Sequence, residues 1–218
     1  MSAREAILAR IRQRQGRPGD TSRVEARVNA RQPGPHSQGL RGADLVQRFC
    51  QRAEALSSTI DQVRSGDAVP AAICRYLDQA GLPRRLVCWP SLAALPWPLA
   101  GLTAEARPAR GEDGVGVTGV FCALAETGSL MLLSGAGTAA ATSLLPETHI
   151  ALVPVERVVA TMDEGFALLR AEHGQLPRAC NVVSGPSRTG DIEQTITLGA
   201  HGPYRVHIVL IGETPVTR

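Results

Sequence analysis

The sequence predicts an α/β protein in which a layered, mixed sheet is flanked by helices. Short apolar runs alternate along the chain with longer segments whose apolar residues recur at helical spacing, which is typical of this class. The composition is globular, with 44% hydrophobic and 20% charged residues in a chain of 218, so one ordinary core can form without a metal or a disulfide. Aromatic residues make up only 3%, and we therefore expect a core of Leu, Val, Ile and Ala.

Residues 1–41 are predicted to be a short helix followed by a flexible basic linker, and residues 42–218 to be a single domain. Ser2 and Glu5 have the spacing of a capping box at the start of the helix. From Gly16 to Arg41 the chain is rich in Gly, Pro, Arg, Gln and Ser, which is typical of a linker. The first 40 residues contain eight arginines and three acidic residues, so this arm is either solvated or contacts an acidic partner.

Two helices are predicted at the beginning of the domain. Asp44 caps the first, and apolar residues then follow one helical face as far as Ser65. The second begins after Asp67 and ends at Gly81, shortly before Pro83, because Gly and Pro terminate helices.

The rest of the domain alternates between strands and helices. One helix begins at the capping pair Thr161 and Glu164 and continues to about Glu172, and a last helix is expected at the end of the polar segment Ser184–Glu193. The predicted strands are the apolar runs Leu86–Trp89, Val115–Ala125, Leu130–Leu133, His149–Val153, Cys180–Val183 and Tyr204–Ile211.

Composition also excludes several classes of function. Lysine is absent, which excludes Schiff-base chemistry and a phosphate-binding loop of the Gly-Lys-Ser/Thr type. The domain has neither the basic surplus nor the aromatic residues of a nucleic-acid-binding surface, so no nucleic acid partner is expected. Its longest charge-poor stretch, residues 114–146, is interrupted by glycines and therefore predicts buried strands and no membrane span.

The five cysteines are widely spaced and odd in number. Because no pair has the close spacing of a zinc or iron–sulfur ligand set, we expect no metal and no cofactor in this chain. Unpaired cysteines in apolar runs are typical of a reducing compartment, so we expect a cytoplasmic protein.

The polar segment that follows the strand Cys180–Val183 is the first candidate site. Its small residues let a ligand approach the backbone, its hydroxyls supply hydrogen bonds, and the Arg188 guanidinium fits a carboxylate or phosphate. The expected helix N-terminus adds free amides, although Asp191 in its first turn would repel an anion. A capped turn without a ligand is the alternative. The candidate ligand-binding residues here are Ser184, Gly185, Ser187, Arg188, Thr189 and Asp191.

Glu126 is the second candidate, because it is the only charged residue between Gly114 and Pro146. A carboxylate is costly to bury unless it is paired or solvated in a cleft. Glu126 is therefore a candidate general base, nucleophile or acceptor for a ligand hydroxyl, with Thr127 and Gly128 beside it as ligand contacts. A hairpin turn with an exposed glutamate explains the same residues and stays open.

Histidines supply the third set of candidates. His149 precedes a strand, and His201 lies with Gly202 in a Gly-Ala-His-Gly-Pro loop. Either imidazole can titrate near neutral pH and contact a ligand. No histidines have the spacing of a metal site on a helix, so no metal ligands are predicted.

Four motifs occur in a fixed order along the chain. They are Ala125–Leu130, Ser143–Pro146 with His149–Ile150, Ser184–Thr189 with Asp191–Glu193, and Gly199 with His201–Pro203. Their order and spacing resemble the LUD domain family, and within it the lactate utilization group, over about residues 42–212. The family often carries an arginine shortly before its Ser-Leu-Leu-Pro motif, whereas this chain has Gly135–Ala141 there.

The resemblance implies an α/β fold related to the NagB/RpiA/CoA-transferase and formyltetrahydrofolate cyclo-ligase group. It also implies a non-redox subunit in the oxidation of L-lactate to pyruvate, which binds a small carboxylate or supports partner subunits that carry the iron–sulfur clusters. Two alternatives remain: an independent isomerase or acyl/CoA-transferase that uses Glu126, and a ligand-sensing regulatory domain. In each case we expect Glu126, Ser184, Arg188, Thr189 and His201 to share one pocket at the carboxyl ends of the strands.

Overall fold

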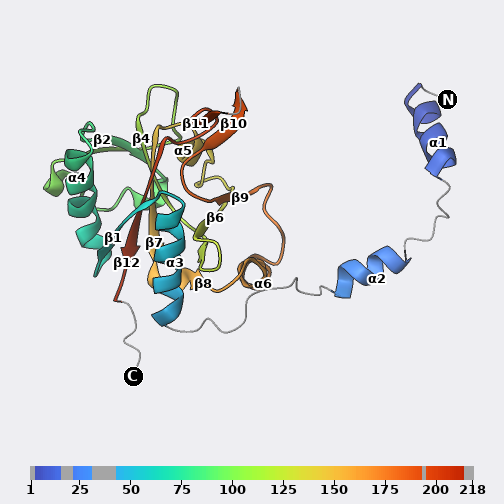
Figure 1. The fold of residues 1–218 in the computed structure, drawn as a ribbon, viewed down its shortest axis with the longest axis horizontal. Coiled ribbons are helices and arrows are strands. Elements are labelled where there is room, and N and C mark those ends of the chain that lie inside the picture. Colours follow the sequence, from blue (N-terminus) through green and yellow to red (C-terminus); the bar gives the residue numbers. More distant parts are fainter. Residues whose placement is uncertain (1–2, 16–21, 31–42, 193–194, 214–218) are drawn as a thin grey trace. The chain divides into compact units, whose positions relative to one another are not determined.

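The structure is a computed structural model that describes residues 3–15, 22–30, 43–192 and 195–213. The chain forms two compact units, Met1–Pro35 and His36–Arg218. The first unit contains helices α1 (Ala3–Gln15) and α2 (Ser22–Ala30), drawn in blue in Figure 1. Within the described ranges, no helix combines the length and apolarity needed to cross a membrane.

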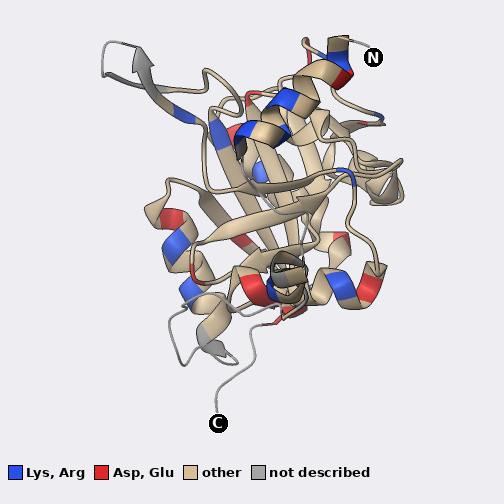
Figure 2. Cartoon of the chain, turned by 90° about the vertical axis from the view of Figure 1, so that its right-hand side faces the viewer, with Lys and Arg blue, Asp and Glu red and all other residues tan. Residues whose placement is uncertain are grey.

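Helix α2 lies inside the segment that the sequence analysis treated as a linker. Its nine residues contain neither Gly nor Pro, so nothing in them interrupts a helix, while the breakers lie on either side. The remainder of the predicted linker falls outside the described residues. Figure 2 shows basic segments along α1, and basic and acidic segments interspersed over the domain.

The domain begins with α3 (Ala43–Ala55), which is followed by strand β1 (Thr59–Val63). The prediction of one helix as far as Ser65 was therefore wrong. Ser57 adopts a left-handed conformation, with φ of 69°, and this ends the helix. The residues beyond it are rich in β-branched side chains, which favour a strand.

A six-stranded parallel sheet forms the centre of the domain, which confirms the predicted α/β class. Its strands lie in the order β1, β12 (Arg205–Ile211), β7 (Thr148–Pro154), β4 (Val115–Gly119), β2 (Arg85–Cys88) and β3 (Thr103–Ala106). Thr148 on β7 is in register with Arg205 on β12 and with Val115 on β4. Strand β3 was not predicted, because its four residues, Thr-Ala-Glu-Ala, contain no large apolar side chain.

Each face of this sheet carries its own core. Helix α4 (Val69–Gln79) covers one face, where Ile73 and Leu77 are buried against strands β4, β7 and β12. Helix α3 and a second sheet cover the other face, where Phe49 and Leu130 pack against Ala151 and Ile208. Figure 1 shows α4 and α3 on opposite sides of the strands. This pattern follows from the strand period of two, which sends successive side chains to opposite faces.

The second sheet contains four strands in the order β8 (Val158–Val159), β5 (Cys122–Leu124), β6 (Ser129–Leu133) and β9 (Cys180–Val183). Its strands are mixed, because β6 is antiparallel to both β5 and β9 while β5 and β8 are parallel. Helix α6 (Met162–His173) packs on this sheet through Gly165. The predicted cap of α6 is confirmed: the Glu164 amide donates to Thr161 Oγ1 at 3.2 Å.

The segment after Ser187 is a β-hairpin of β10 (Arg188–Ile192) and β11 (Thr195–Leu198), not the predicted helix. Isoleucines and threonines recur along it, and β-branched residues favour strands. The remaining elements are short: helix α5 (Ala141–Leu144) and the 3-10 turns η1 (Gly66–Ala68), η2 (Pro90–Leu92), η3 (Trp97–Ala100) and η4 (Val155–Arg157).

Candidate functional site

Two of the predicted motifs meet at one edge of the second sheet. Strands β5 and β9 run in the same direction on either side of β6, because β6 is antiparallel to both. Glu126 and Ser184 follow the ends of β5 and β9, so they flank Ser129 at the beginning of β6. The hydroxyl oxygens of Ser129 and Ser184 are 2.7 Å apart and share a hydrogen bond.

This edge opens into a cavity of about 470 Å³, which we call the Glu126 hollow. Four elements form it: the C-terminal end of α3, the β5–β6 turn, the end of β9 and the first residue of α6. Its lining residues are Arg52, Ala55, Leu56, Glu126, Thr127, Ser129, Met162, Val182 and Ser184.

The Glu126 carboxylate already has a partner inside the protein. Its Oε1 accepts a hydrogen bond of 2.9 Å from the backbone N–H of Met162, the first residue of α6. The first amides of a helix have no partner within the helix, and the helix dipole favours an anion there. Glu126 is half-buried and caps α6 from the β5–β6 turn, a contact that the sequence did not predict.

A second cavity, of about 390 Å³, lies on the other side of Ser184, and we call it the Arg188 hollow. Arg188 Nη2 donates a hydrogen bond to Ser57 Oγ. The backbone N–H of Ser187 donates to the Pro203 carbonyl at 2.9 Å, which joins the two loops that form the cavity. Its lining residues are Ser143, Leu144, Val182, Val183, Ser184, Gly185, Pro186, Ser187, Arg188, His201, Gly202 and Pro203.

The two hollows share Val182 and Ser184, but neither is lined by both Glu126 and Arg188. The five residues were expected to share one pocket at the carboxyl ends of the strands. Ser184, Arg188 and His201 line the Arg188 hollow, whereas Glu126 lines the other hollow and Thr189 lines neither. His201 precedes β12, as its position in the sequence already indicated, so it reaches this hollow from the amino end of a strand in the main sheet.

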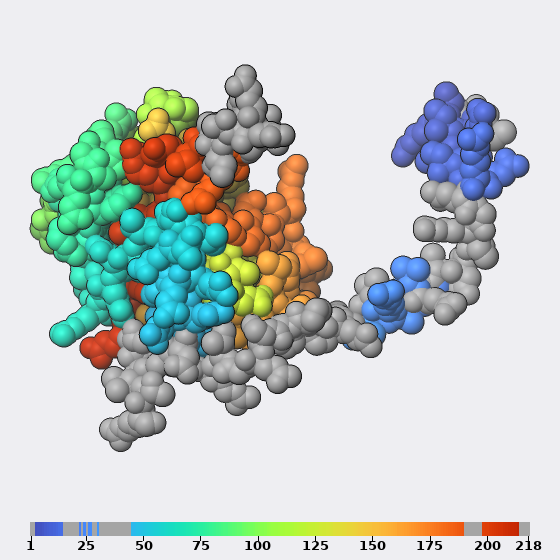
Figure 3. Space-filling model, in the orientation of Figure 1, coloured from blue at the N-terminus to red at the C-terminus, as the bar shows by residue number. Residues whose placement is uncertain are grey.

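Glycines in both motifs make room for α3. Gly128 and Gly185 have φ of 70° and 76°, a region that glycine enters without steric cost. A Cβ at Gly128 would lie 2.3 Å from the Ala53 nitrogen, and one at Gly185 would lie 2.4 Å from the Leu56 oxygen. Figure 3 shows α3, in cyan, directly against the yellow-green β5–β6 segment. These glycines thus let both candidate loops pack closely against α3 and the residue that follows it.

His149 lies away from both hollows, inside the main sheet. It is fully buried, and its Nε2 forms a hydrogen bond of 2.8 Å with Thr118 Oγ1. Burial lowers the pKa of His149 to about 4, so the imidazole is neutral at neutral pH. The expectation that it titrates near neutrality was therefore wrong, because sequence position alone did not reveal complete burial.

The two other predicted ligand contacts lie in the β10–β11 hairpin. Thr189 is in register with Thr197 on β11 and does not line either hollow. Asp191 lies on β10, but its side chain is outside the described part of the structure. Since no helix begins here, the predicted amide site and helix dipole are absent from this described segment.

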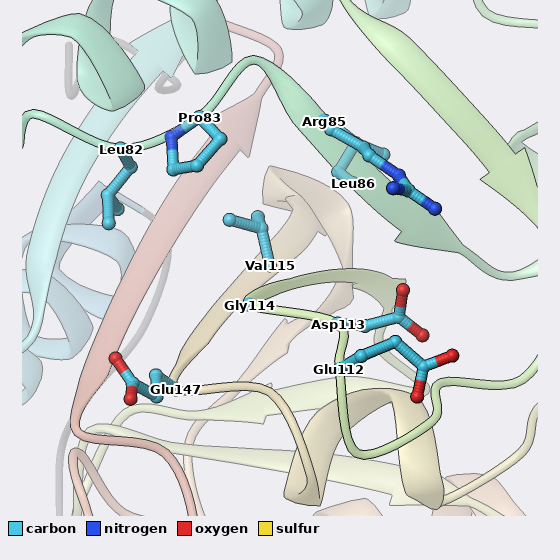
Figure 4. Close-up of a pocket in the computed structure, with 9 residues that line it drawn as sticks. All are labelled: Leu82, Pro83, Arg85, Leu86, Glu112, Asp113, Gly114, Val115 and Glu147. Atoms are coloured by element: carbon cyan, nitrogen blue, oxygen red, sulfur yellow. The ribbon is translucent and has the colours of Figure 1, made fainter.

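A third cavity, of about 440 Å³, lies at the amino ends of β2, β4 and β7. Figure 4 shows Glu112, Asp113 and Glu147 around it, with Arg85 on the opposite wall. Asp113 is already paired with Arg107 at 2.6 Å. The acidic lining repels a carboxylate ligand, so this cavity does not suit one.

Among the described side chains, no group of three or more His, Cys, Asp or Glu residues could hold a metal.

Sequence reasoning missed a fourth cavity, at the carboxyl ends of β2 and β4, where Trp89, Val120 and Phe121 lie. The sequence prediction placed all three residues inside strands, Leu86–Trp89 and the single run Val115–Ala125. The structure ends β2 at Cys88 and divides the longer run into β4 and β5, which puts Trp89, Val120 and Phe121 in the connections.

The parallel sheet with a second sheet packed on one face defines the class of protein as an α/β domain. Its motifs meet at two hollows of about 470 and 390 Å³. The chain belongs to the LUD domain family, whose model matches residues 93–211. This confirms the resemblance drawn from the motifs. The chain is similar to proteins named "Lactate utilization protein C" along nearly its full length.

Two such relatives are 28% identical to this chain. The one from Shouchella clausii aligns with 96% of this chain and 98% of its own length, and the one from Bacillus subtilis with 96% of both. A third, from Halalkalibacterium halodurans, is 37% identical over 44% of each chain.

A solved structure is similar in fold. The crystal structure of a DUF162 family protein from Deinococcus radiodurans superposes with a TM-score of 0.60, over 80% of this chain and all of that one (100%). The two sequences are 24% identical, so this similarity concerns the fold alone.

Proposed function

We propose that this protein takes part in L-lactate utilisation as a non-redox component that binds a small carboxylate, such as lactate or pyruvate. The observation that carries the proposal is the similarity to proteins named "Lactate utilization protein C" over 96% of this chain. Similarity along nearly the full length supports a shared role more strongly than a shared fold does.

The Arg188 hollow is the place we propose for the carboxylate. Arg188 is exposed and presents a guanidinium, whose planar donors match a carboxylate. Ser187 and His201 line the same cavity and add polar groups that can hydrogen-bond the hydroxyl or carbonyl of the ligand. A ligand here would compete with Ser57 for the Arg188 donors.

Oxidation of lactate to pyruvate releases two electrons and two protons, and we propose that iron–sulfur partner subunits accept the electrons. The cysteines of this chain are free thiols. Cys88 and Cys122 are buried in separate core clusters, so they serve packing. A protein complex purified from lactate-grown cells should contain partner chains with bound iron. Recovery of the tagged chain without iron-containing partners would contradict this part of the proposal.

Growth of a deletion strain tests the proposal in the source organism. We expect the strain to grow on pyruvate but not on L-lactate, and the intact gene to restore growth on lactate. Arg188→Ala should fail to restore it, whereas Arg170→Ala, an exposed arginine on α6, should restore it fully. Normal growth of the deletion strain on L-lactate would contradict the proposed role.

Binding to the purified chain tests the ligand site itself. Arg188→Ala should weaken the binding of lactate or pyruvate by about 1.5–3 kcal/mol, the scale of a hydrogen bond to a charged group. Titration calorimetry with Arg170→Ala as control measures this. Equal affinity in both variants would place the carboxylate elsewhere.

A catalytic role for Glu126 is the second candidate, because its carboxylate lines a cavity beside the hydrogen-bonded pair of Ser129 and Ser184. Glu126→Gln keeps an oxygen that can accept from the Met162 amide but removes the basic carboxylate. If Glu126 acts as base or nucleophile, this variant should not support growth on lactate. If it only caps α6, growth should be normal.

A further inference from the structure

We infer that the fourth cavity binds a planar, uncharged aromatic or heteroaromatic ring. This cavity, the carboxyl-edge cleft, has a volume of about 440 Å³, within the usual range for small-molecule sites. It shares no lining residue with the Glu126 or Arg188 hollow, so the inference does not depend on the proposed function. Its lining residues are Trp89, Val120, Phe121, Leu133, Ser134, Gly135, Thr138, His173, Gln175 and Pro177.

The position of the cleft in the sheet favours a ligand. After β2 the chain adds β3 on one side, and it then returns to place β4 on the other side of β2. From β4 it continues in the opposite direction through β7 and β12. Ligands of open α/β sheets bind beyond the carboxyl ends of the strands at such a reversal. Trp89 directly follows β2 and Val120 directly follows β4, so the cleft lies at this point.

The walls of the cleft favour a flat ring. The whole chain has only two Trp, two Tyr and three Phe residues, yet Trp89 and Phe121 both line this one cavity. The His173 ring packs against Phe121 with a centroid distance of 5.6 Å and an interplanar angle of 59°. Trp89 Nε1 donates to the Ala139 carbonyl at 3.2 Å, which fixes the orientation of the indole. Held rings of this kind interact with a ligand ring through stacked or edge contacts.

Two hydroxyls give the cleft a polar edge with defined roles. Ser134 Oγ accepts from the Ala179 N–H at 2.8 Å, which leaves its O–H free to donate. Thr138 Oγ1 uses its O–H to donate to the Leu133 carbonyl at 2.7 Å, which leaves its lone pairs free to accept. The cleft therefore offers a donor from Ser134 and an acceptor from Thr138. These two groups match a ring whose edge carries a hydrogen-bond acceptor and a hydrogen-bond donor.

The charges around the cleft favour an uncharged ligand. No carboxylate or guanidinium lines it. Arg157 contacts one of its rings, with the guanidinium 5.6 Å from the Phe121 centroid. Arg157 is neutralised by Glu172, at 2.7 Å. A charged ligand would lose its hydration without gaining a counter-ion.

Tryptophan fluorescence tests the inference, because the two indoles report on different places. Trp89 lines the cleft, whereas Trp97 is buried in the core beneath α4 on the other face of the sheet. Trp97→Phe leaves Trp89 as the reporter, and Trp89→Phe leaves Trp97. We would titrate both variants with adenosine, with nicotinamide and with the non-planar control 1,4-cyclohexanedimethanol.

We expect at least one planar probe to change Trp89 emission in a saturable way, with a Kd below about 1 mM, and the control alcohol to have no effect. Adenosine binding would indicate a purine ligand, and nicotinamide binding would indicate a ring that carries a carboxamide. Trp97 emission should not change saturably. Absence of saturable binding by both planar probes, or equal binding of the control alcohol, would overturn the inference.

A blocking variant locates the binding. Gln175→Phe adds a ring at an exposed residue of the cleft lining, and Leu176→Phe adds the same ring to the exposed neighbour outside it. Gln175→Phe should weaken probe binding by about tenfold or more, and Leu176→Phe should not. Calorimetry measures both affinities, and thermal unfolding checks that both variants fold. Unchanged affinity in a folded Gln175→Phe protein would place the probe elsewhere and overturn the assignment.

Discussion

At the scale of single residues, two buried histidines couple stability to pH. His207 stacks on Tyr76, with centroids 3.9 Å apart and an angle of 7°, and its Nδ1 hydrogen-bonds Thr59 Oγ1 at 2.9 Å. Burial lowers the pKa of His207 to about 4, although nearby Asp61 and the contact with Thr59 act in the opposite direction. Burial likewise lowers the pKa of His149 to about 4. Both imidazoles are therefore neutral in the folded protein.

We predict that the protein loses stability as the pH falls from about 6.5 towards 4. In this window the unfolded chain, with ordinary histidine pKa values near 6.5, binds protons that the folded chain excludes. For each imidazole, the free energy of unfolding should be about 2 kcal/mol lower at pH 5 than at pH 7.5. Denaturant unfolding at both pH values measures the loss.

His207→Phe is the matched variant, because it keeps the stacking on Tyr76 and removes the titrating group. It should show about half the loss of the unmodified protein. The carboxylates Asp78, Glu105 and Asp113 do not obscure this window, since their arginine partners lower their pKa values and their contribution is lost only at lower pH. An identical loss in His207→Phe would contradict the assignment.

Ser57 is the only non-glycine residue with positive φ in the described part of the chain. We predict that Ser57→Gly is more stable than Ser57→Ala by about 1 kcal/mol, because both lose the hydroxyl contact with Arg188 while only glycine relieves the left-handed strain. Thermal or denaturant unfolding of the two variants measures the difference. Equal stabilities would show that the conformation at Ser57 carries no strain.

At the scale of elements, the contact between α3 and the β5–β6 turn depends on Gly128. We predict that Gly128→Ala destabilises the protein more than Gly174→Ala does. Both glycines have positive φ, 70° and 66°, but a Cβ at Gly174 meets nothing within 4 Å. Gly174→Ala should therefore cost about 1–2 kcal/mol of strain, and Gly128→Ala about 1–3 kcal/mol more from the clash with α3.

Denaturant unfolding of both variants checks this comparison. A retained circular dichroism spectrum would show that Gly128→Ala still folds. Equal destabilisation of the two variants would contradict the prediction. It would mean that α3 shifts without a loss of unfolding free energy and that Gly128 is needed only for its positive φ in the turn.

Most helices and strands of the domain were predicted from the sequence, and two of the errors have a common cause. Residues 59–63 continue the apolar spacing of α3, so they were predicted to be helical. The acidic residues near Asp191 are typical of the first turn of a helix, so a helix was predicted there as well. In both places β-branched side chains and partner strands decided the outcome. Strand pairing is a long-range interaction, so local periodicity does not reveal it.

At the scale of the whole molecule, the first helix of the N-terminal unit leaves its apolar residues exposed. Ile7, Leu8 and Ile11 of α1 are 60%, 40% and 45% exposed, so α1 buries little apolar surface. We predict that removal of residues 1–35 leaves unfolding cooperative and changes stability by less than about 0.5 kcal/mol. A broadened or shifted transition in the truncated protein would show that this unit supports the domain.

The sequence by itself determined the α/β class, the positions of most strands and the family, because these follow from apolar periodicity and from motif order. It also singled out Glu126, Ser184 and Arg188 as notable residues. Only the tertiary structure decided what surrounds them. Met162 comes to Glu126 from 36 residues away, and Ser57 comes to Arg188 from 131 residues away. Such contacts depend on how whole elements pack, and packing joins residues whose separation in sequence carries no local signal.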